Sequence, residues 1–230
     1  MPRVSLLAVC AAATALLISG QSAPKAKPTA SKANPTASVG VFMDFDRDSA
    51  PGDAPLEIMK DEVDKLLNPS GVKLNWHLAK ENRGNQAFSG LVVLKFRGKC
   101  RVEGWNSPVG MPTRPDFGSP GEVTTLGFTR VSGGKVLPYS EVECDEIKKA
   151  LAYLPAGTGK KEKQRALGLA MGRVVAHELY HVLASTTAHA ARGLAEATES
   201  LDDLISPAPL GFDVWDSQAI GQAFAAAKKP

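Results

Sequence analysis

Two histidines and one glutamate with the spacing H-E-x-x-H lie at residues 177–181, as His177, Glu178 and His181. Residues four apart on a helix share one face, with Cβ atoms roughly 5–6 Å apart. Two imidazoles so placed can both reach one metal ion at about 2.0–2.1 Å. Glu178 projects beside them and can act as a base on a metal-bound water. The spacing therefore predicts a hydrolytic metal site with Glu178 as the catalytic residue.

The helix that carries this motif is expected to turn it toward the protein core. At about 100° per residue, one sector of the helix is apolar and also contains part of the motif. A buried glutamate without a partner is costly, and a divalent cation supplies one. The competing interpretation is a helix at the edge of the core whose histidines have other partners. The sector holds Leu167, Ala170, Met171, Val174, Glu178 and His181, with His177 at its edge.

A catalytic zinc site needs three protein ligands and an open position. His189 follows His181 by eight residues, which is about 12 Å along a continuous helix. One ion could not bind both across that distance. We therefore expect the helix to end between about Ala184 and Ala188, with the chain folding back. The Ser-Thr-Thr run at 185–187 is a poor helix former and permits this stop.

The segment around His177 resembles the zincin metalloproteases, and its histidine-rich end looks like the metzincin branch. Metzincins carry H-E-x-x-H-x-x-G-x-x-H, so the resemblance implies that His177 and His181 are zinc ligands and that Glu178 is the general base. In this chain Ala184 occupies the family's glycine position and Thr187 its third histidine position. No methionine follows Met171 to form the family's methionine turn. The chain is also similar, over roughly residues 39–204, to exported bacterial proteins with this motif.

Glu199 is an alternative third ligand. It lies eighteen residues beyond His181, and Asp203 follows on the same face of an expected helix over 195–205. This arrangement is similar to that of the gluzincins, in which a second helix donates a glutamate and a nearby aspartate orients a ligating histidine. The sequence favours His189 as the third metal ligand and leaves Glu199 open.

The N-terminal residues have the pattern of a secretory signal. Arg3 precedes an apolar run over 4–18, and small residues follow at 19–23, so we expect a signal peptide over 1–23. Residues 24–38 are rich in Pro, Ala, Ser, Thr and Lys and predict a disordered linker. A zincin-like domain over 39–206 and a C-terminal helical tail over 207–230 would follow. The expected location is secreted or periplasmic, with no stable membrane insertion after cleavage.

Composition and charge are those of a globular protein with one core. The chain has 230 residues, of which 43% are hydrophobic, and a formal net charge of +3. Its basic residues are dispersed, which excludes a nucleic-acid-binding stripe. The exported chain would keep Cys100 and Cys144. An oxidising compartment favours a disulfide between them over two separate buried thiols.

Hydrophobic periodicity predicts an α+β fold with a small twisted mixed sheet packed on helices. Strands are expected at 39–45, 72–78 and 91–96, the last central, with a hairpin over 124–143. Pro138 predicts that the second hairpin strand is an edge strand, beside which a peptide could add in extended form. A helix at 213–227 would end the chain. His77 is expected on a solvent-exposed polar face.

Together these patterns predict an exported zinc metalloprotease that hydrolyses peptide bonds in a protein or peptide substrate. One catalytic Zn²⁺ would be held by His177, His181 and His189, with Glu178 as general base. The displaced third histidine and the missing methionine leave an alternative, a catalytically weak or inactive zincin-fold binding module. A metal hydrolase that acts on other bonds is a third interpretation.

Overall fold

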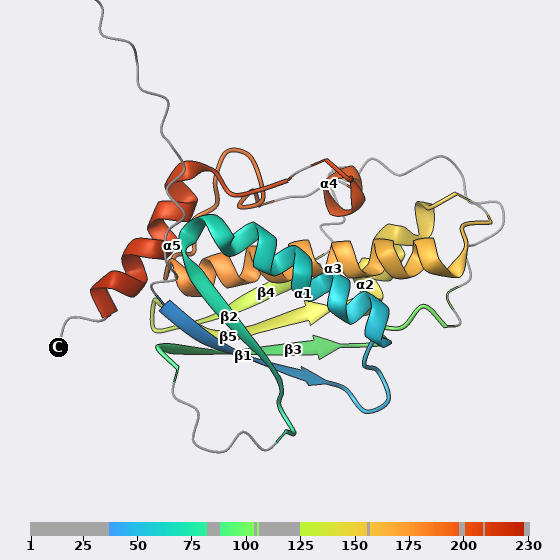
Figure 1. Ribbon diagram of the computed structural model, residues 1–230, viewed down its shortest axis with the longest axis horizontal. Helices are drawn as coiled ribbons and strands as arrows, with labels where there is room; N and C mark the ends of the chain where they lie inside the picture. The colour runs from blue at the N-terminus through green and yellow to red at the C-terminus, as the bar shows by residue number, and fades with distance from the viewer. Residues whose placement is uncertain are drawn as a thin grey trace, which may run out of the picture. The chain divides into compact units, whose positions relative to one another are not determined.

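The computed structural model describes residues 37–81, 88–103, 105, 125–155, 157–197, 201–208 and 210–227. Over these residues the chain is an α+β structure in which helices pack on a five-stranded mixed sheet (Figure 1). The strands are β1 (Ala37–Phe45), β2 (Val72–Leu78), β3 (Gly90–Arg97), β4 (Gly127–Ser132) and β5 (Lys135–Glu143). The helices are α1 (Asp53–Leu67), α2 (Cys144–Ala150), α3 (Lys160–Leu183), α4 (Leu201–Ile205) and α5 (Val214–Ala227). Two short 3-10 turns are η1 (Asn68–Ser70) and η2 (Leu151–Tyr153).

The sheet has the strand order β2-β1-β3-β5-β4. Four strands are parallel, and β4 runs antiparallel to β5. Because side chains alternate across a strand, Val39, Val41 and Met43 of β1 all face the core and are buried. The predicted central position of the strand over 91–96 is confirmed, since β3 lies in the middle of the sheet.

The edge position predicted for the second hairpin strand is wrong. The edge strands of the described sheet are β2 and β4, and β5 lies between β4 and β3. Pro138 is tolerated because β5 pairs with β3 only from Tyr139 onward. Its pairing with β4 is also irregular between Thr129 and Val131. A proline at such an irregularity removes no regular ladder hydrogen bond.

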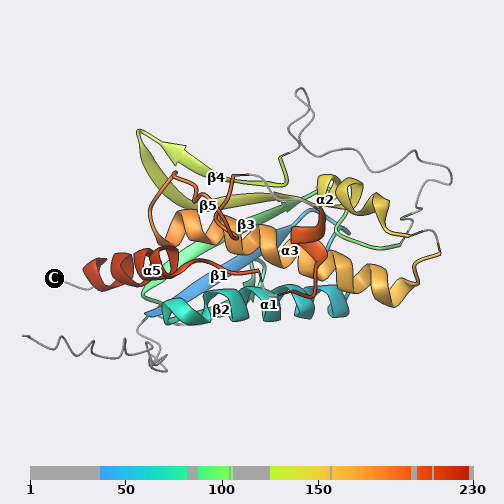
Figure 2. The same cartoon turned by 90° about the horizontal axis from the view of Figure 1, so that it is seen from above.

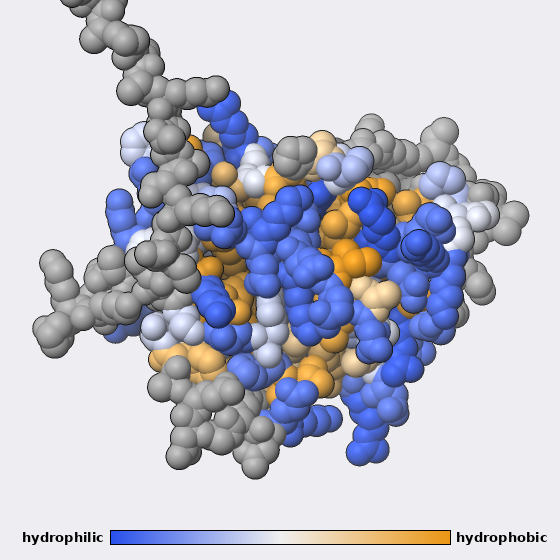
Figure 3. Space-filling model, viewed as in Figure 1, coloured by the Kyte–Doolittle hydropathy of each residue, from blue (hydrophilic) through white to orange (hydrophobic). Residues whose placement is uncertain are grey.

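Helix α3 lies at the centre of the helical layer and is buried on nearly all sides. Every residue from 166 to 176 is buried, because α1 packs along one side of α3 while β4 and β5 contact another (Figure 2). Gly168 and Gly172 allow the close approach of α1. A Cβ atom at Gly168 would lie 2.7 Å from Ile58 Cβ, and one at Gly172 would lie 3.0 Å from the carbonyl oxygen of Met59. The outer face of α1 carries charged side chains (Figure 3).

A buried arginine joins α3 to α1 and to the segment around α4. Arg173 is 2% exposed, and its Nε donates to Glu62 Oε1 at 3.0 Å. Its remaining nitrogens donate to the carbonyl oxygens of Asp203 and Ser206. The helix predicted over 195–205 is observed only as α4. Glu196 lies before it in a turn, in which the Glu196 N–H donates to the Gly193 carbonyl.

The predicted disulfide between Cys100 and Cys144 is present, with a Cα–Cα distance of 5.0 Å. It ties the segment after β3 to the first residue of α2, and both cysteines are fully buried. Within the described ranges, no helix combines the length and the apolar character that crossing a bilayer requires.

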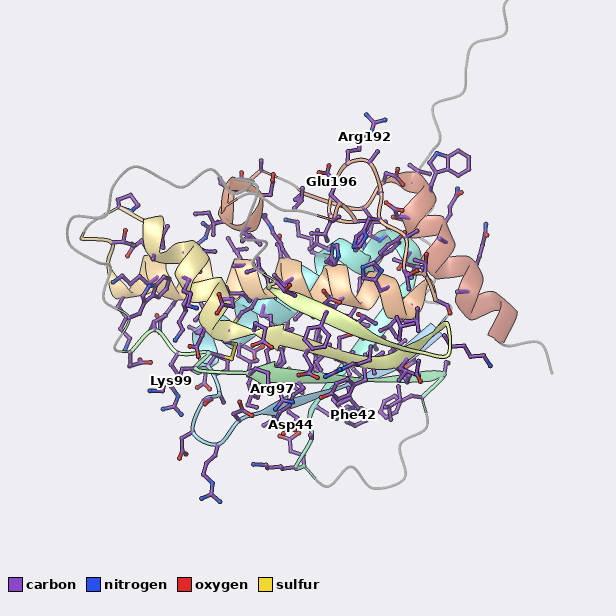
Figure 4. All side chains as sticks on the ribbon, turned by 180° about the vertical axis from the view of Figure 1, so that it is seen from behind. Phe42, Asp44, Arg97, Lys99, Arg192 and Glu196 are labelled. Atoms are coloured by element: carbon purple, nitrogen blue, oxygen red, sulfur yellow. A yellow bond between two sulfur atoms is a disulfide. The ribbon has the colours of Figure 1, made fainter. Side chains whose placement is uncertain are left out.

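The sheet face that α1 and α3 leave uncovered carries paired charges. Lys95 contacts Asp44 and Asp46, each at 3.0 Å, and Glu141 accepts from Arg97 at 2.9 Å. Figure 4 shows Phe42, Asp44 and Arg97 on this side of the sheet, whereas Arg192 and Glu196 lie on the loop that follows α3. The uncovered face therefore carries ion pairs together with the aromatic ring of Phe42, and it lies on the side of the sheet away from the histidine motif.

Candidate metal centre

Three histidines converge at the C-terminal end of α3. His177 and His181 project from its last two turns, and His189 returns to them from the following loop. Their candidate ligand atoms all lie within 4.8 Å of one another, so the cluster can hold a metal ion. The ring centroid of His189 lies 5.3 Å from that of His177 and 4.8 Å from that of His181.

Backbone carbonyls fix the tautomers of the two helical histidines. The Nδ1 of His177 lies 2.8 Å from the Leu194 carbonyl oxygen, and the Nδ1 of His181 lies 2.9 Å from the Thr186 carbonyl oxygen. A carbonyl oxygen can only accept, so in each neutral ring Nδ1 carries the proton and donates it. Each Nε2 is left with a lone pair.

These two lone pairs point at a common place. The Nε2 atoms of His177 and His181 are 3.1 Å apart. Two nitrogen ligands of one tetrahedral zinc ion, each about 2.0–2.1 Å from the metal, would be about 3.3 Å apart, close to this distance. Burial also lowers the pKa of His177 to about 4 and lowers the pKa of His181, which keeps both rings neutral near pH 7. Neutral imidazoles with converging lone pairs are the form that binds a metal.

The turn that brings His189 back begins where α3 ends, at Leu183 and its C-cap Ala184. Ser185 follows in a left-handed conformation, with φ 51°. The Ser185 N–H donates to the Val182 carbonyl, and the Thr186 N–H donates to the His181 carbonyl. This is the Schellman pattern of helix termination, usually built with glycine at the left-handed position. The helix thus ends at Leu183, one residue before the predicted interval, with its C-cap Ala184 as the first residue of that interval, and a serine takes the left-handed position.

The loop after the turn is anchored by Leu194, whose side chain is fully buried. The Leu194 N–H donates to the Gly211 carbonyl at 3.1 Å, and its own carbonyl accepts from His177. One residue therefore connects α3, this loop and the segment before α5. Such an outer partner orients a ligand ring and is part of most histidine metal sites.

Glu178 lies against the edge strand and is 4% exposed. Its Oε2 accepts a hydrogen bond of 2.6 Å from Thr129 Oγ1 of β4. Burial raises the pKa of Glu178 to about 7, although the Thr129 hydrogen bond acts in the opposite direction. A carboxyl group with such a pKa can both accept and release a proton near neutral pH. Sequence patterns did not indicate Thr129, because its contact depends on how β4 docks on α3.

The other predicted residues lie elsewhere or outside the described chain. Glu199 falls in the undescribed residues 198–200. His77 is half-buried on β2, not exposed as predicted, and its ring stacks on Phe42 with centroids 5.2 Å apart. Tyr180 packs in the core and stacks on Phe212, with ring centroids 5.6 Å apart. The centre therefore combines three imidazoles with one buried carboxyl group, that of Glu178, which follows His177 on α3.

A scan against protein-family models finds no match to this chain, and a search of curated proteins finds none either.

Proposed function

We propose that this protein is an exported zinc-dependent metallopeptidase of the zincin type, with His177, His181 and His189 as metal ligands and Glu178 as general base. The observation that carries the proposal is the convergence of the three imidazoles, with Nδ1 of two of them committed to backbone carbonyls. Among the described residues the cluster offers three histidines, which would leave one of four coordination positions open, as in catalytic zinc sites.

The donor set fits zinc. Neutral imidazole nitrogens are borderline ligands that suit Zn²⁺, whereas Ca²⁺ and Mg²⁺ take oxygen ligands. When bound, zinc would supply a Lewis acid that polarises a substrate carbonyl and lowers the pKa of a water molecule.

A side chain of the protein would carry out the proton transfers. Glu178 takes the proton from the attacking water and then delivers it to the leaving amine. Its buried surroundings keep the proton affinity of the carboxyl group high enough for both steps, as its pKa near 7 indicates. His177 and His181 remain neutral and keep their orientation through Leu194 and Thr186.

Strand β4 supplies a place for an extended peptide. It is one of the two edge strands of the described sheet, and its Thr129 contacts Glu178. Unpaired backbone groups at a sheet edge can bind a peptide as an added strand. A peptide on β4 would therefore lie next to the general base, which supports a protein or peptide as the substrate.

Export is supported by the disulfide between Cys100 and Cys144. Such bonds persist in oxidising compartments and are rare in the cytosol. A secreted or periplasmic location is therefore proposed, consistent with the signal pattern over residues 1–23.

Hydrolysis of casein and measured zinc content test the proposal together. Glu178→Gln should retain about one zinc per chain and lose roughly 10²–10⁴-fold in kcat, because a general base contributes this much. The matched control is Glu162→Gln, which changes an exposed glutamate in the first turn of the same helix and should leave both values unchanged.

Histidine variants test the ligand set in the same assay. His189→Ala should lower zinc content and abolish hydrolysis, whereas His77→Ala, which removes the histidine on β2, should do neither. Zinc retained by wild type without hydrolysis of any member of a broad peptide library would refute the peptidase and favour the binding module. Unchanged zinc content in His189→Ala would refute His189 as a ligand.

A further inference from the structure

Two hydroxyl side chains occupy core-facing positions of the sheet beneath Glu178. Thr129 of β4 and Ser140 of β5 are cross-strand partners. Ser140 also pairs in register with the fully buried Leu94 and is itself 0% exposed. Apolar side chains would fill these positions at no cost in desolvation. The hydroxyls therefore need polar partners, and the chain provides one in Glu178.

The hydrogen bonds of these hydroxyls have a definite direction. Thr129 Oγ1 lies 2.6 Å from Glu178 Oε2 and 3.1 Å from the Glu178 carbonyl oxygen, but it has one proton to donate. The ionised carboxylate oxygen is the stronger and nearer acceptor. Ser140 Oγ, 2.8 Å from Thr129 Oγ1, then donates to Thr129. The chain of donors runs from Ser140 through Thr129 to Oε2.

The second carboxylate oxygen lies where β4 has no side chain. A Cβ atom added to Gly127 would lie 3.0 Å from Glu178 Oε1 and 2.8 Å from Val174 Cγ1. Gly127 and Thr129 are two apart, so they face the same side of β4. Thr129 donates a hydrogen bond to Oε2, and the missing side chain at Gly127 lets Oε1 pack close to β4 without a covering side chain.

We infer that Thr129, supported by Ser140, is a positioning residue that holds Oε2 of Glu178 and leaves Oε1 as the oxygen that exchanges the proton. The inference rests on the proposed peptidase function and deepens it. The edge strand then has a role in orienting the base in addition to binding substrate.

Substitutions at Thr129 distinguish the effect of its hydroxyl group from the effect of its side-chain shape. Thr129→Val keeps the shape and should lower kcat by about 10-fold or more, with KM and zinc content unchanged, because a hydrogen bond to a charged group is lost. Thr129→Ser should recover most of kcat, and Ser140→Ala should cause a smaller loss than Thr129→Val. The matched control is Thr158→Val, which also removes a 2.6 Å hydroxyl hydrogen bond, but near the start of α3.

A readout without activity comes from a double-mutant cycle on the unfolding equilibrium of the metal-free protein. Thr129→Val and Glu178→Ala, alone and together, should show a coupling of about 10-fold in the unfolding constant. If wild type is active and Thr129→Val keeps the full kcat, the inference is overturned and the peptidase proposal stands. If wild type proves inactive, the peptidase proposal fails. The cycle then decides separately whether Thr129 holds Glu178, and coupling near 1 overturns that contact.

Discussion

The carboxyl group of Glu178 is held in surroundings that suit the proposed general base and that do not favour stability. It is 4% exposed, with Thr129 as a hydrogen-bond partner of one oxygen. Burial raises its pKa from the usual 4.5 to about 7, so the folded protein prefers its neutral form. A buried carboxyl group with a raised pKa costs the metal-free protein stability at neutral pH.

This pKa predicts a pH-dependent difference in stability. Between about pH 4.5 and 7 the folded metal-free protein binds the Glu178 proton more tightly than the unfolded chain does, so this contribution to stability is lost as pH rises. Relative to Glu178→Gln, the free energy of unfolding of wild type should fall by about 3 kcal/mol from pH 4.5 to 8. Urea unfolding of both metal-free proteins across this range measures it.

The comparison with Glu178→Gln removes the effects of the histidines. Burial lowers the pKa of His177 to about 4. The stability that neutral His177 contributes is therefore lost as pH falls below about 6.5, whereas the contribution of Glu178 is lost as pH rises. Both proteins share the contribution of His177, and it cancels in their difference. A difference that stays constant from pH 4.5 to 8 would show that the Glu178 pKa is not raised.

At the scale of elements, the C-terminal turn of α3 decides whether a third histidine can join the first two. Ser185 adopts φ 51°, and its neighbours satisfy the last carbonyls of the helix. A left-handed conformation costs a non-glycine residue roughly 1–2 kcal/mol. The candidate site therefore tolerates strain in the backbone close to its histidines.

Replacing Ser185 by glycine should relieve this strain. We expect Ser185→Gly to raise the free energy of unfolding by about 1 kcal/mol, with zinc content unchanged, in chemical denaturation. Ala184→Gly is the matched control, since Ala184 has an ordinary right-handed conformation and glycine there should destabilise instead. Equal effects of the two substitutions would argue against strain at Ser185.

Features set by local spacing could be predicted from the sequence. The helical motif placed Glu178 and His181 on one buried face with His177 at its edge, and the helix stop before His189 followed from the rise per residue of a helix. Features set by tertiary register could not be predicted. The edge position of β4 and the contact of Thr129 with Glu178 depend on strand order, which periodicity does not encode. Leu194 acts through its backbone carbonyl, for which no residue type is diagnostic.

At the scale of the whole molecule, long-range cross-links hold the layers together. Arg173 connects α3 to α1 through Glu62 and to the α4 segment through backbone carbonyls. Breaking a buried pair by removing one partner leaves an uncompensated charge, which costs several kcal/mol. The disulfide between Cys100 and Cys144 plays a similar part between the end of β3 and the start of α2.

Reducing that disulfide should lower stability without changing the fold. The cysteines are separated by 44 residues, and closing a loop of this length restricts the unfolded chain by about 4 kcal/mol. Urea unfolding of the metal-free protein with and without a thiol-free reductant measures the loss. An unchanged unfolding midpoint, with complete reduction verified by mass, would contradict it.

The position of this cross-link along the chain also sets an order of assembly. Cys100 and Cys144 both precede α3, so under the proposed export from the N-terminus both thiols would be offered for oxidation before His177 had emerged. The covalent loop can form while the space for α3 is still empty. The histidine-bearing helix would then pack on a sheet that is already cross-linked, and binding of the proposed metal would come last.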